Sequence, residues 1–228
     1  GDRPVRGMAD REGIEANLRA WRGSDLVAAR IDAIPPAILE GQLINSNVVT
    51  EAESGWNPLD DATGILQFGV DVGRARDHLA IAERRGRKIR DIYAEVLGED
   101  DHSRGVEILM GMVRTRRRPH ERKPRVVFDE TGHEGMKFGK ELRRYVAASR
   151  DPRDEIEIIG VQFGSPPRNK RLFDKRRDEI AHAFGVWLKT GTIPPDGELE
   201  AEIEATVSER VEVAYGAGGT KWEVMRVI

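Results

Sequence analysis

The stretch from residue 66 to residue 82 constrains the fold most strongly. It reads LQFGVDVGRARDHLAIA, which predicts an apolar strand with Asp71 near its end, a tight basic turn with Asp77, and a second apolar strand. A carboxylate on a buried strand is costly unless a cation, a hydrogen-bond network or a metal ion compensates it. Because Asp71 is flanked by Val70 and Val72, we expect it either to support the turn or to bind something.

A second acid, Asp129, stands in the same kind of setting. The segment RVVFDETG at residues 125–132 predicts a short buried strand, an acid and a Gly-bearing turn. Two strands that each end in Asp suggest carboxylates that converge at one sheet edge. We expect Asp71 and Asp129 to come close enough to share a metal ion, with Asp77 nearby.

The periodicity of the remaining chain predicts a mixed α/β sheet with helices on its faces. Strands alternate apolar and polar residues, whereas helices repeat apolar residues every three or four positions. After the opening strand, strands are predicted at 78–84, 88–96, 126–128, 156–161, 210–215 and 221–228, and helices at 101–116, 134–147, 169–189 and 197–205. Three consecutive strands followed by alternating helices and strands favour this architecture.

The residues before this pattern predict a separate, smaller region. Residues 1–33 hold one helical segment with an apolar stripe of Ile14, Leu18 and Trp21, which is too short to form a core alone. Residues 34–62 carry turn signals and are interpreted as a linker, and the compact domain starts at Thr63. The chain begins without Met and stops inside a strand-like run, so we expect a piece of a longer protein.

Composition excludes several classes. With 228 residues and no cysteine, disulfides and thiolate metal sites are ruled out. No apolar run approaches the length of a membrane span. The net charge is −3, but residues 114–118 and 170–177 are basic and residues 196–204 are acidic, so a polyanionic partner is not excluded.

In this order, the acids and elements resemble the ribonuclease H-like fold, and most closely the nuclease domain of tailed-phage terminase large subunits. The resemblance is carried by GVDVG at 69–73 with Asp77, FDETGHEG at 128–135, NKR at 169–171 and the late strand pair with its Gly loop. Trp21 with the following GSD, and residues 30–35, look like the end of the terminase ATPase domain. The resemblance thus implies a motor-domain tail at 1–33, a linker at 34–62 and a nuclease domain at 63–228.

The resemblance implies a DNA endonuclease that cuts concatemeric phage DNA during genome packaging in the host cell cytoplasm. Its partners would be double-stranded DNA, the terminase small subunit and the portal protein. The chain has no phosphate loop of the form GxxxxGK[ST], so the packaging ATPase itself is not within it. The family pattern places a third carboxylate after the late strands, beyond Ile228.

Phosphodiester hydrolysis needs an activated water and charge neutralisation at the phosphate, which two divalent ions about 3.5–4 Å apart provide. Mg²⁺ or Mn²⁺ suits a site built from carboxylates without cysteine. Asp71 would contact both ions, Asp129 would hold one, and Asp77 would support the site from its turn. Glu130 is expected to face away, because adjacent strand residues alternate sides.

DNA contact is expected from Lys170 and Arg171, at the start of the long helix, and from Arg74 and Arg76 in the basic turn. Each basic run could instead be a solvated helix face. His133 could instead be a residue of the turn. Phe184 and Trp187 fall on an apolar stripe and are predicted as core residues.

Three other functions stay open on the sequence. The segment GVDVG also resembles the first phosphate loop of actin-like and sugar-kinase ATPases, although such proteins need two related domains and no repeat is present. A non-catalytic docking module of a packaging motor would keep the fold without cutting DNA. A junction resolvase shares the chemistry but not the upstream terminase-like segment.

Overall fold

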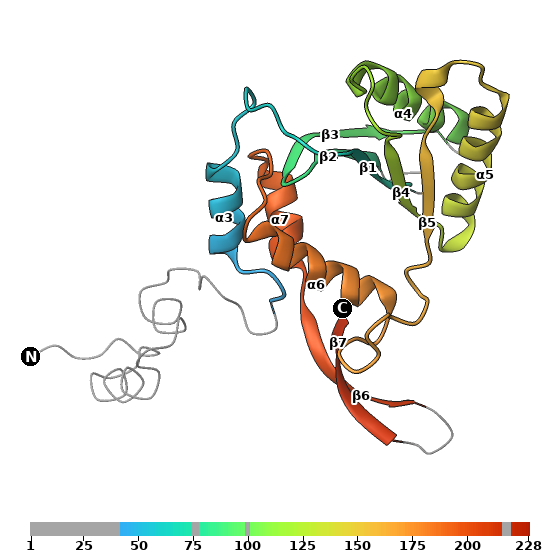
Figure 1. Ribbon diagram of the computed structural model, residues 1–228. Coiled ribbons are helices and arrows are strands. Elements are labelled where there is room, and N and C mark those ends of the chain that lie inside the picture. The colour runs from blue at the N-terminus through green and yellow to red at the C-terminus, as the bar shows by residue number, and fades with distance from the viewer. Residues whose placement is uncertain (1–41, 74–77, 99–100, 216–219) are drawn as a thin grey trace, which may run out of the picture.

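The computed structural model describes residues 42–73, 78–98, 101–215 and 220–228 (Figure 1). In chain order the elements are α3 (Ser46–Ser54), β1 (Leu66–Asp71), β2 (His78–Arg85), β3 (Lys88–Val96), α4 (His102–Arg116), β4 (Arg125–Asp129), α5 (Gly132–Ala148), the 3-10 helix η1 (Pro152–Asp154), β5 (Glu157–Val161), α6 (Arg176–Leu188), α7 (Gly197–Ala205), β6 (Ser208–Tyr215) and β7 (Thr220–Val227). The predicted N-terminal helix lies outside these residues.

A five-stranded mixed sheet forms the centre of the molecule. Its order is β3-β2-β1-β4-β5, with antiparallel pairing of β1 with β2 and of β2 with β3. Strand β1 pairs in parallel with β4, and β4 pairs in parallel with β5. The first three strands follow one another with only a few residues between them, which suits antiparallel pairing, whereas the helical crossovers that follow permit parallel pairing. The predicted mixed sheet is confirmed.

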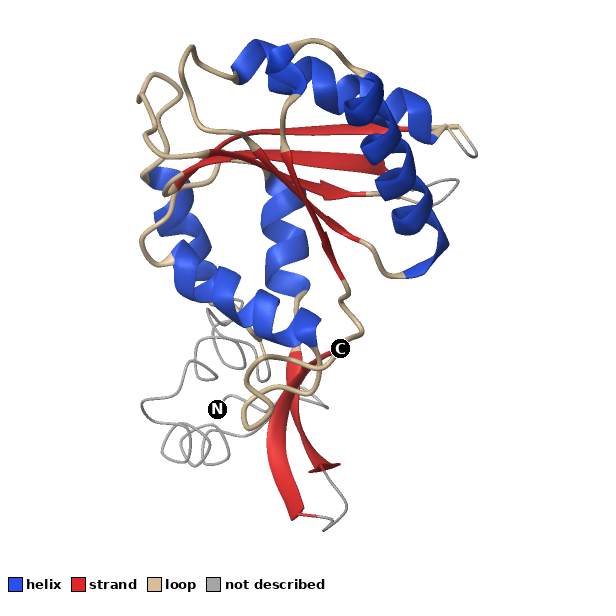
Figure 2. Ribbon diagram, turned by 45° about the vertical axis from the view of Figure 1, so that its right-hand side comes forward, coloured by secondary structure: helices blue, strands red, loops and turns tan. Residues whose placement is uncertain are grey.

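Helices α4 and α5 cover one face of this sheet and enclose the main core (Figure 2). On β1, Leu66, Phe68 and Val70 are buried, while the alternate residues are not, as expected for a strand with one face on the core. The rings of Phe128 and Phe138 meet edge to face with centroids 5.6 Å apart. This contact fixes α5 against β4, the strand that carries Asp129.

A second, smaller core lies on the other side of the sheet, among α3, α6 and α7 (Figure 1). Its buried residues are Ile44, Val49, Ala52, Leu188, Ile193 and Ile203. Phe184 and Trp187 pack against it, so their prediction as core residues is confirmed. Part of the predicted linker therefore forms a packed helix, and the division into 1–33, 34–62 and 63–228 stays a prediction.

The predicted bounds agree with the structure to within two residues for every α-helix and strand from β2 onward except α6, while the short 3-10 helix η1 was not predicted. The helix predicted from residue 169 begins only at Arg176, so the first third of that prediction is wrong. The backbone amide of Asn169 donates to the Glu179 carboxylate at 3.3 Å, and the amide of Met225 donates to the carbonyl of Leu172 at 2.8 Å. These tertiary bonds hold the segment in turns beside β7.

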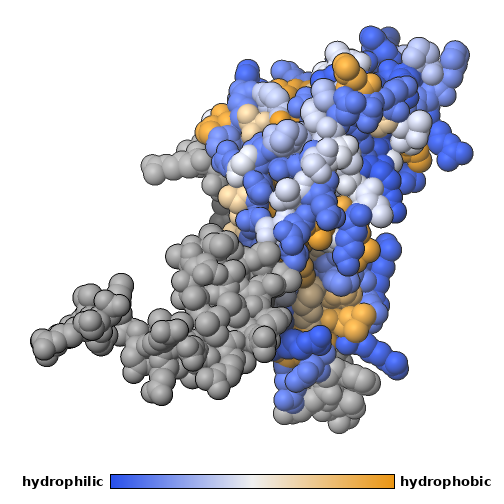
Figure 3. Space-filling model, turned by 90° about the vertical axis from the view of Figure 1, so that its left-hand side faces the viewer, coloured by the Kyte–Doolittle hydropathy of each residue, from blue (hydrophilic) through white to orange (hydrophobic). Residues whose placement is uncertain are grey.

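Strands β6 and β7 pair with each other in a separate two-stranded sheet that extends away from the domain (Figure 1). The face drawn in Figure 3 is mainly hydrophilic where it is not grey, with apolar residues in small groups. Among the described helices, none combines the length and the apolar character needed to cross a membrane.

Candidate active site

Asp71 and Asp129 end two neighbouring parallel strands. The last paired residues of β1 and β4 are Val70 and Phe128. Asp71 comes directly after Val70, and Asp129 comes directly after Phe128. Both acids line a cleft of about 440 Å³ at the carboxyl ends of these two strands. The other residues lining it are Val72, Thr131, Gly132, His133, Glu134 and Gly135. The structure therefore brings together the two acids that the sequence singled out.

The turn from β4 into α5 orients Asp129. Its Oδ1 accepts a hydrogen bond from the backbone amide of Thr131 at 2.8 Å, and Thr131 Oγ1 accepts one from the amide of Phe163 at 2.7 Å. Gly132 adopts a φ of 83°, which glycine tolerates without strain. One carboxylate oxygen of Asp129 is thus held by the backbone.

The first turn of α5 approaches the end of β4 very closely. A Cβ built on Gly135 would lie 3.0 Å from the carbonyl carbon of Asp129 and nearer still to its carbonyl oxygen. Only glycine permits this approach, because the opposing atoms are backbone and cannot rotate away. The approach places His133 and Glu134 in the cleft beside the two aspartates.

Glu130 faces away from the cleft, as predicted. Arg143 Nη1 donates to its carboxylate at 2.7 Å, and its backbone amide donates to the carbonyl of Val161 at 2.8 Å. Its side chain also fills the space beside Gly160. Glu130 therefore links α5 to β5 and is not among the residues that line the cleft.

Glu134 is a cleft residue that the sequence interpretation missed. Its Oε2 lies 2.9 Å from Nε2 of His102, whose side chain is 13% exposed. His133, interpreted as a turn residue, is exposed in the first turn of α5 and also lines the cleft. Their place in the sequence could have indicated this role. The first helical turn after a parallel strand lies at the strand's carboxyl end, where ligands bind in α/β sheets.

Three predicted site residues, Arg74, Arg76 and Asp77, lie outside the described residues, so their roles stay predictions. Within the ranges that the structure describes, no group of three His, Asp or Glu side chains is close enough to hold a metal ion. In the described part of the cleft the carboxylates are those of Asp71, Asp129 and Glu134, and that of Glu134 lies against His102.

Lys170 and Arg171 do not open a helix. Both are exposed, in the turn that precedes α6, where Asn169 Oδ1 accepts from the amide of Arg171 at 3.2 Å. Neither is among the residues that line the cleft. Their contact with DNA stays a prediction.

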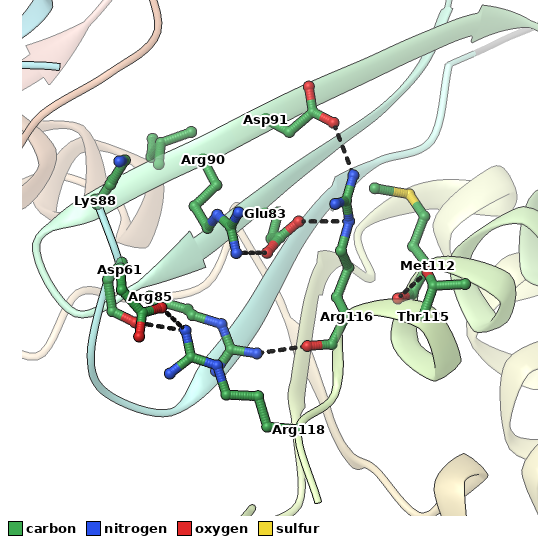
Figure 4. Close-up of polar contacts among 12 residues, drawn as sticks. Asp61, Glu83, Arg85, Lys88, Arg90, Asp91, Met112, Thr115, Arg116 and Arg118 are labelled. Atoms are coloured by element: carbon green, nitrogen blue, oxygen red, sulfur yellow. Dashed lines mark hydrogen bonds and ion pairs between the residues drawn. The ribbon is translucent and has the colours of Figure 1, made fainter. Parts of the chain in front are cut away.

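The arginines of residues 114–118 are engaged by the protein itself. Arg116 Nε lies 3.2 Å from the fully buried carboxylate of Glu83, and Arg118 forms an ion pair with Asp61 (Figure 4). Arg114 contacts Asp154 through Nε at 2.7 Å and Nη2 at 2.6 Å, and these bonds raise the pKa of the guanidinium. This run therefore holds the fold together at the end of the sheet opposite Asp71.

No protein-family model matches this chain, and no curated protein matches its sequence. Solved structures do match. The nuclease domain of the large terminase subunit gp2 of bacterial virus Sf6 has a TM-score of 0.57 at 13% identity, over 82% of this chain and 87% of that chain. A mutant of that domain with manganese has a TM-score of 0.56 at 11% identity over the same shares. A mutant with calcium has a TM-score of 0.53 at 13% identity, over the same shares of the two chains. This chain has the ribonuclease H-like fold of large terminase nuclease domains.

Proposed function

We propose that this chain is the nuclease domain of a genome-packaging terminase, a metal-dependent endonuclease that cuts double-stranded DNA. The observation that carries the proposal is the pair Asp71 and Asp129, which end adjacent parallel strands in one open cleft. The fold is that of terminase nuclease domains, and two of the similar structures contain manganese or calcium. Packaging partners, namely the small subunit and the portal protein, are part of this proposal by resemblance.

The donor set suits Mg²⁺ or Mn²⁺, which prefer oxygen ligands. Asp71 would contact two ions, Asp129 would hold one through the oxygen that Thr131 leaves open, and Asp77 would add a carboxylate from its turn. The ions would supply an activated water and neutralise charge on the phosphate. Waters and phosphate oxygens would complete the coordination, as they commonly do for Mg²⁺.

The protein's own contribution is to fix geometry. The amide of Thr131 holds Asp129 in one orientation, and parallel pairing of β1 with β4 sets its separation from Asp71. Such preorganisation matters because a misplacement of 1 Å can cost about a hundredfold in rate. Asp71, Thr131 and His133 are exposed at the cleft, so it opens to solvent.

Plasmid nicking and linearisation with Mg²⁺ or Mn²⁺ tests the proposal. Asp71→Asn and Asp129→Asn should each abolish cutting while thermal unfolding stays cooperative. The matched control is Glu157→Gln, which removes a carboxylate at the opposite end of the sheet, where Arg125 Nε lies 2.7 Å from it. Undiminished cutting by Asp71→Asn would contradict the proposal. Absent cutting in wild type, with both DNA binding and Mn²⁺ binding retained, would favour a non-catalytic docking module.

DNA binding should be carried mainly by phosphate contacts, so affinity should depend weakly on sequence and strongly on salt. The double variant Lys170→Gln, Arg171→Gln should lower affinity evenly across sequences and reduce the salt slope by about 1.8. A duplex-binding titration over a salt series measures both quantities. An unchanged slope would remove these two residues from the DNA interface.

A further inference from the structure

A second cavity lies directly beside the catalytic cleft. It has a volume of about 540 Å³ and is lined by His102, Ser103, Lys137, Lys140, Glu141 and Arg144. It adjoins the cleft through one contact, because Glu134 lines the cleft, His102 lines the cavity, and their side chains are 2.9 Å apart. We call this second cavity the α5 groove.

The α5 groove carries an excess of positive charge. Lys137, Lys140 and Arg144 recur three and four residues apart on α5, so they form one stripe along the helix. Glu141 is the one acid among the six lining residues. Its carboxylate already accepts from Ser103 Oγ at 3.2 Å and forms an ion pair with Arg144. Three cations against one acid leave the lining with a charge of +2.

The stripe differs from the basic run at residues 114–118. Arg114, Arg116 and Arg118 are each neutralised by buried or neighbouring acids. Lys140, by contrast, is exposed and has no acidic partner among the residues that the structure describes. A concave, basic surface next to a phosphodiester-cutting cleft has the charge and shape to hold a polyanion.

We propose that the α5 groove binds the phosphate backbone of the duplex on one side of the bond that is cut. This inference rests on the proposed function. An α-helix rises about 1.5 Å per residue, so Lys137 to Arg144 covers about 10.5 Å, the axial length of roughly three nucleotides of one strand. From His133 in the cleft to Arg144 is about 16.5 Å, or roughly five base pairs. The backbone leaving the cleft follows α5 over that length.

The first experiment compares two triple variants that lose the same charge. One is Lys137→Gln, Lys140→Gln, Arg144→Gln. The other is a control of three exposed residues at the far end of the sheet, namely Arg87→Gln, Lys123→Gln and Lys189→Gln. Fluorescence anisotropy of a labelled 24-base-pair duplex, with EDTA to prevent cutting, gives affinity against salt.

The groove variant should reduce the slope of log affinity against log salt concentration by about 2.7. At about 0.1 M salt it should lower affinity at least tenfold, and by about 500-fold if all three residues contact phosphates. The control variant should keep the wild-type slope. Equal losses in both variants would assign the effect to net charge and overturn the inference. Thermal unfolding of both variants checks that they fold.

The second experiment uses the absence of cysteine from the chain, which allows single tethers for an iron chelate that breaks nearby DNA. Tethers are placed at Lys140→Cys, at His133→Cys in the cleft, and at Arg87→Cys, exposed in the β2–β3 turn at the opposite end of the sheet, as a remote control. The tether at residue 140 should break DNA about as efficiently as the one at residue 133, and the control should not.

If the tether at residue 140 breaks DNA no more often than the one at residue 87, while the cleft tether is active, the groove inference is overturned and the proposed function still stands. Failure of the wild-type chain to bind the duplex would contradict the proposed function itself. The two failures are therefore distinguishable.

Discussion

Gly135→Ala offers the sharpest test of how the cleft beside Asp71 and Asp129 is built. A Cβ at this position would lie 3.0 Å from the carbonyl carbon of Asp129 and 3.2 Å from Cα of Glu130. Because carbon atoms pack best at about 3.5–4.0 Å, the first turn of α5 must move by at least about 0.5 Å. The obstructing atoms are backbone, so no change of rotamer relieves the contact.

The expected loss of stability follows from two opposing effects. Overpacking of this kind costs up to about 3 kcal/mol, and replacing Gly by Ala within a helix returns about 1 kcal/mol. The net loss is about 2 kcal/mol, which lowers the melting temperature by about 4–8 °C in a domain of this size. Cutting should fall further than stability, by about a hundredfold, because the displaced turn holds Asp129 in place.

The matched control is Gly111→Ala in α4, where nothing lies within 4 Å of the added Cβ. That variant should gain about 0.5–1 kcal/mol and cut DNA at the wild-type rate. Denaturant unfolding gives the stability and plasmid nicking gives the rate. Wild-type stability and cutting in Gly135→Ala would refute the close approach of α5 to β4.

Further predictions concern the ion pairs and the metal. Hydrogen bonds from Arg114 hold the pKa of Asp154 below its usual range, against the opposing effect of burial, so this pair stabilises the fold above the unfolded pKa of about 3.9. That stability should disappear as pH falls through the lowered pKa, and a melting series should show less loss in acid for Asp154→Asn. Glu121→Gln should cost about 3 kcal/mol, because it leaves the fully buried Arg85 without its anionic partner; denaturant unfolding measures this, and a loss under 1 kcal/mol would contradict it. Chelation of divalent ions should abolish plasmid cutting without lowering the melting temperature of the chain by more than a few degrees, and cutting in excess EDTA would contradict metal dependence.

The sequence by itself determined the order of elements and the placement of Asp71 and Asp129. The alternation of apolar residues along β1 and β2 and the continuous apolar run of β4 are local properties, since they follow from neighbouring residues whatever the rest of the fold does. An acid that ends such a strand therefore lies where the strand leaves the sheet, at its carboxyl end. Parallel pairing of β1 with β4 then aligns the two acids, and the alternation of elements already favoured that pairing.

Tertiary structure decided which polar side chains find one another. The arginines of 114–118 are basic in any local view, and only the fold supplies Glu83, Asp61 and Asp154 from segments far away in sequence. The start of α6 was likewise set by distant backbone partners in β7, which compete with local helix propensity. Glu134 reaches the cleft because Gly135 lets α5 approach the end of β4. Hydrogen bonds and ion pairs depend on distances of a few ångströms between distant segments, and sequence periodicity carries no information on those distances.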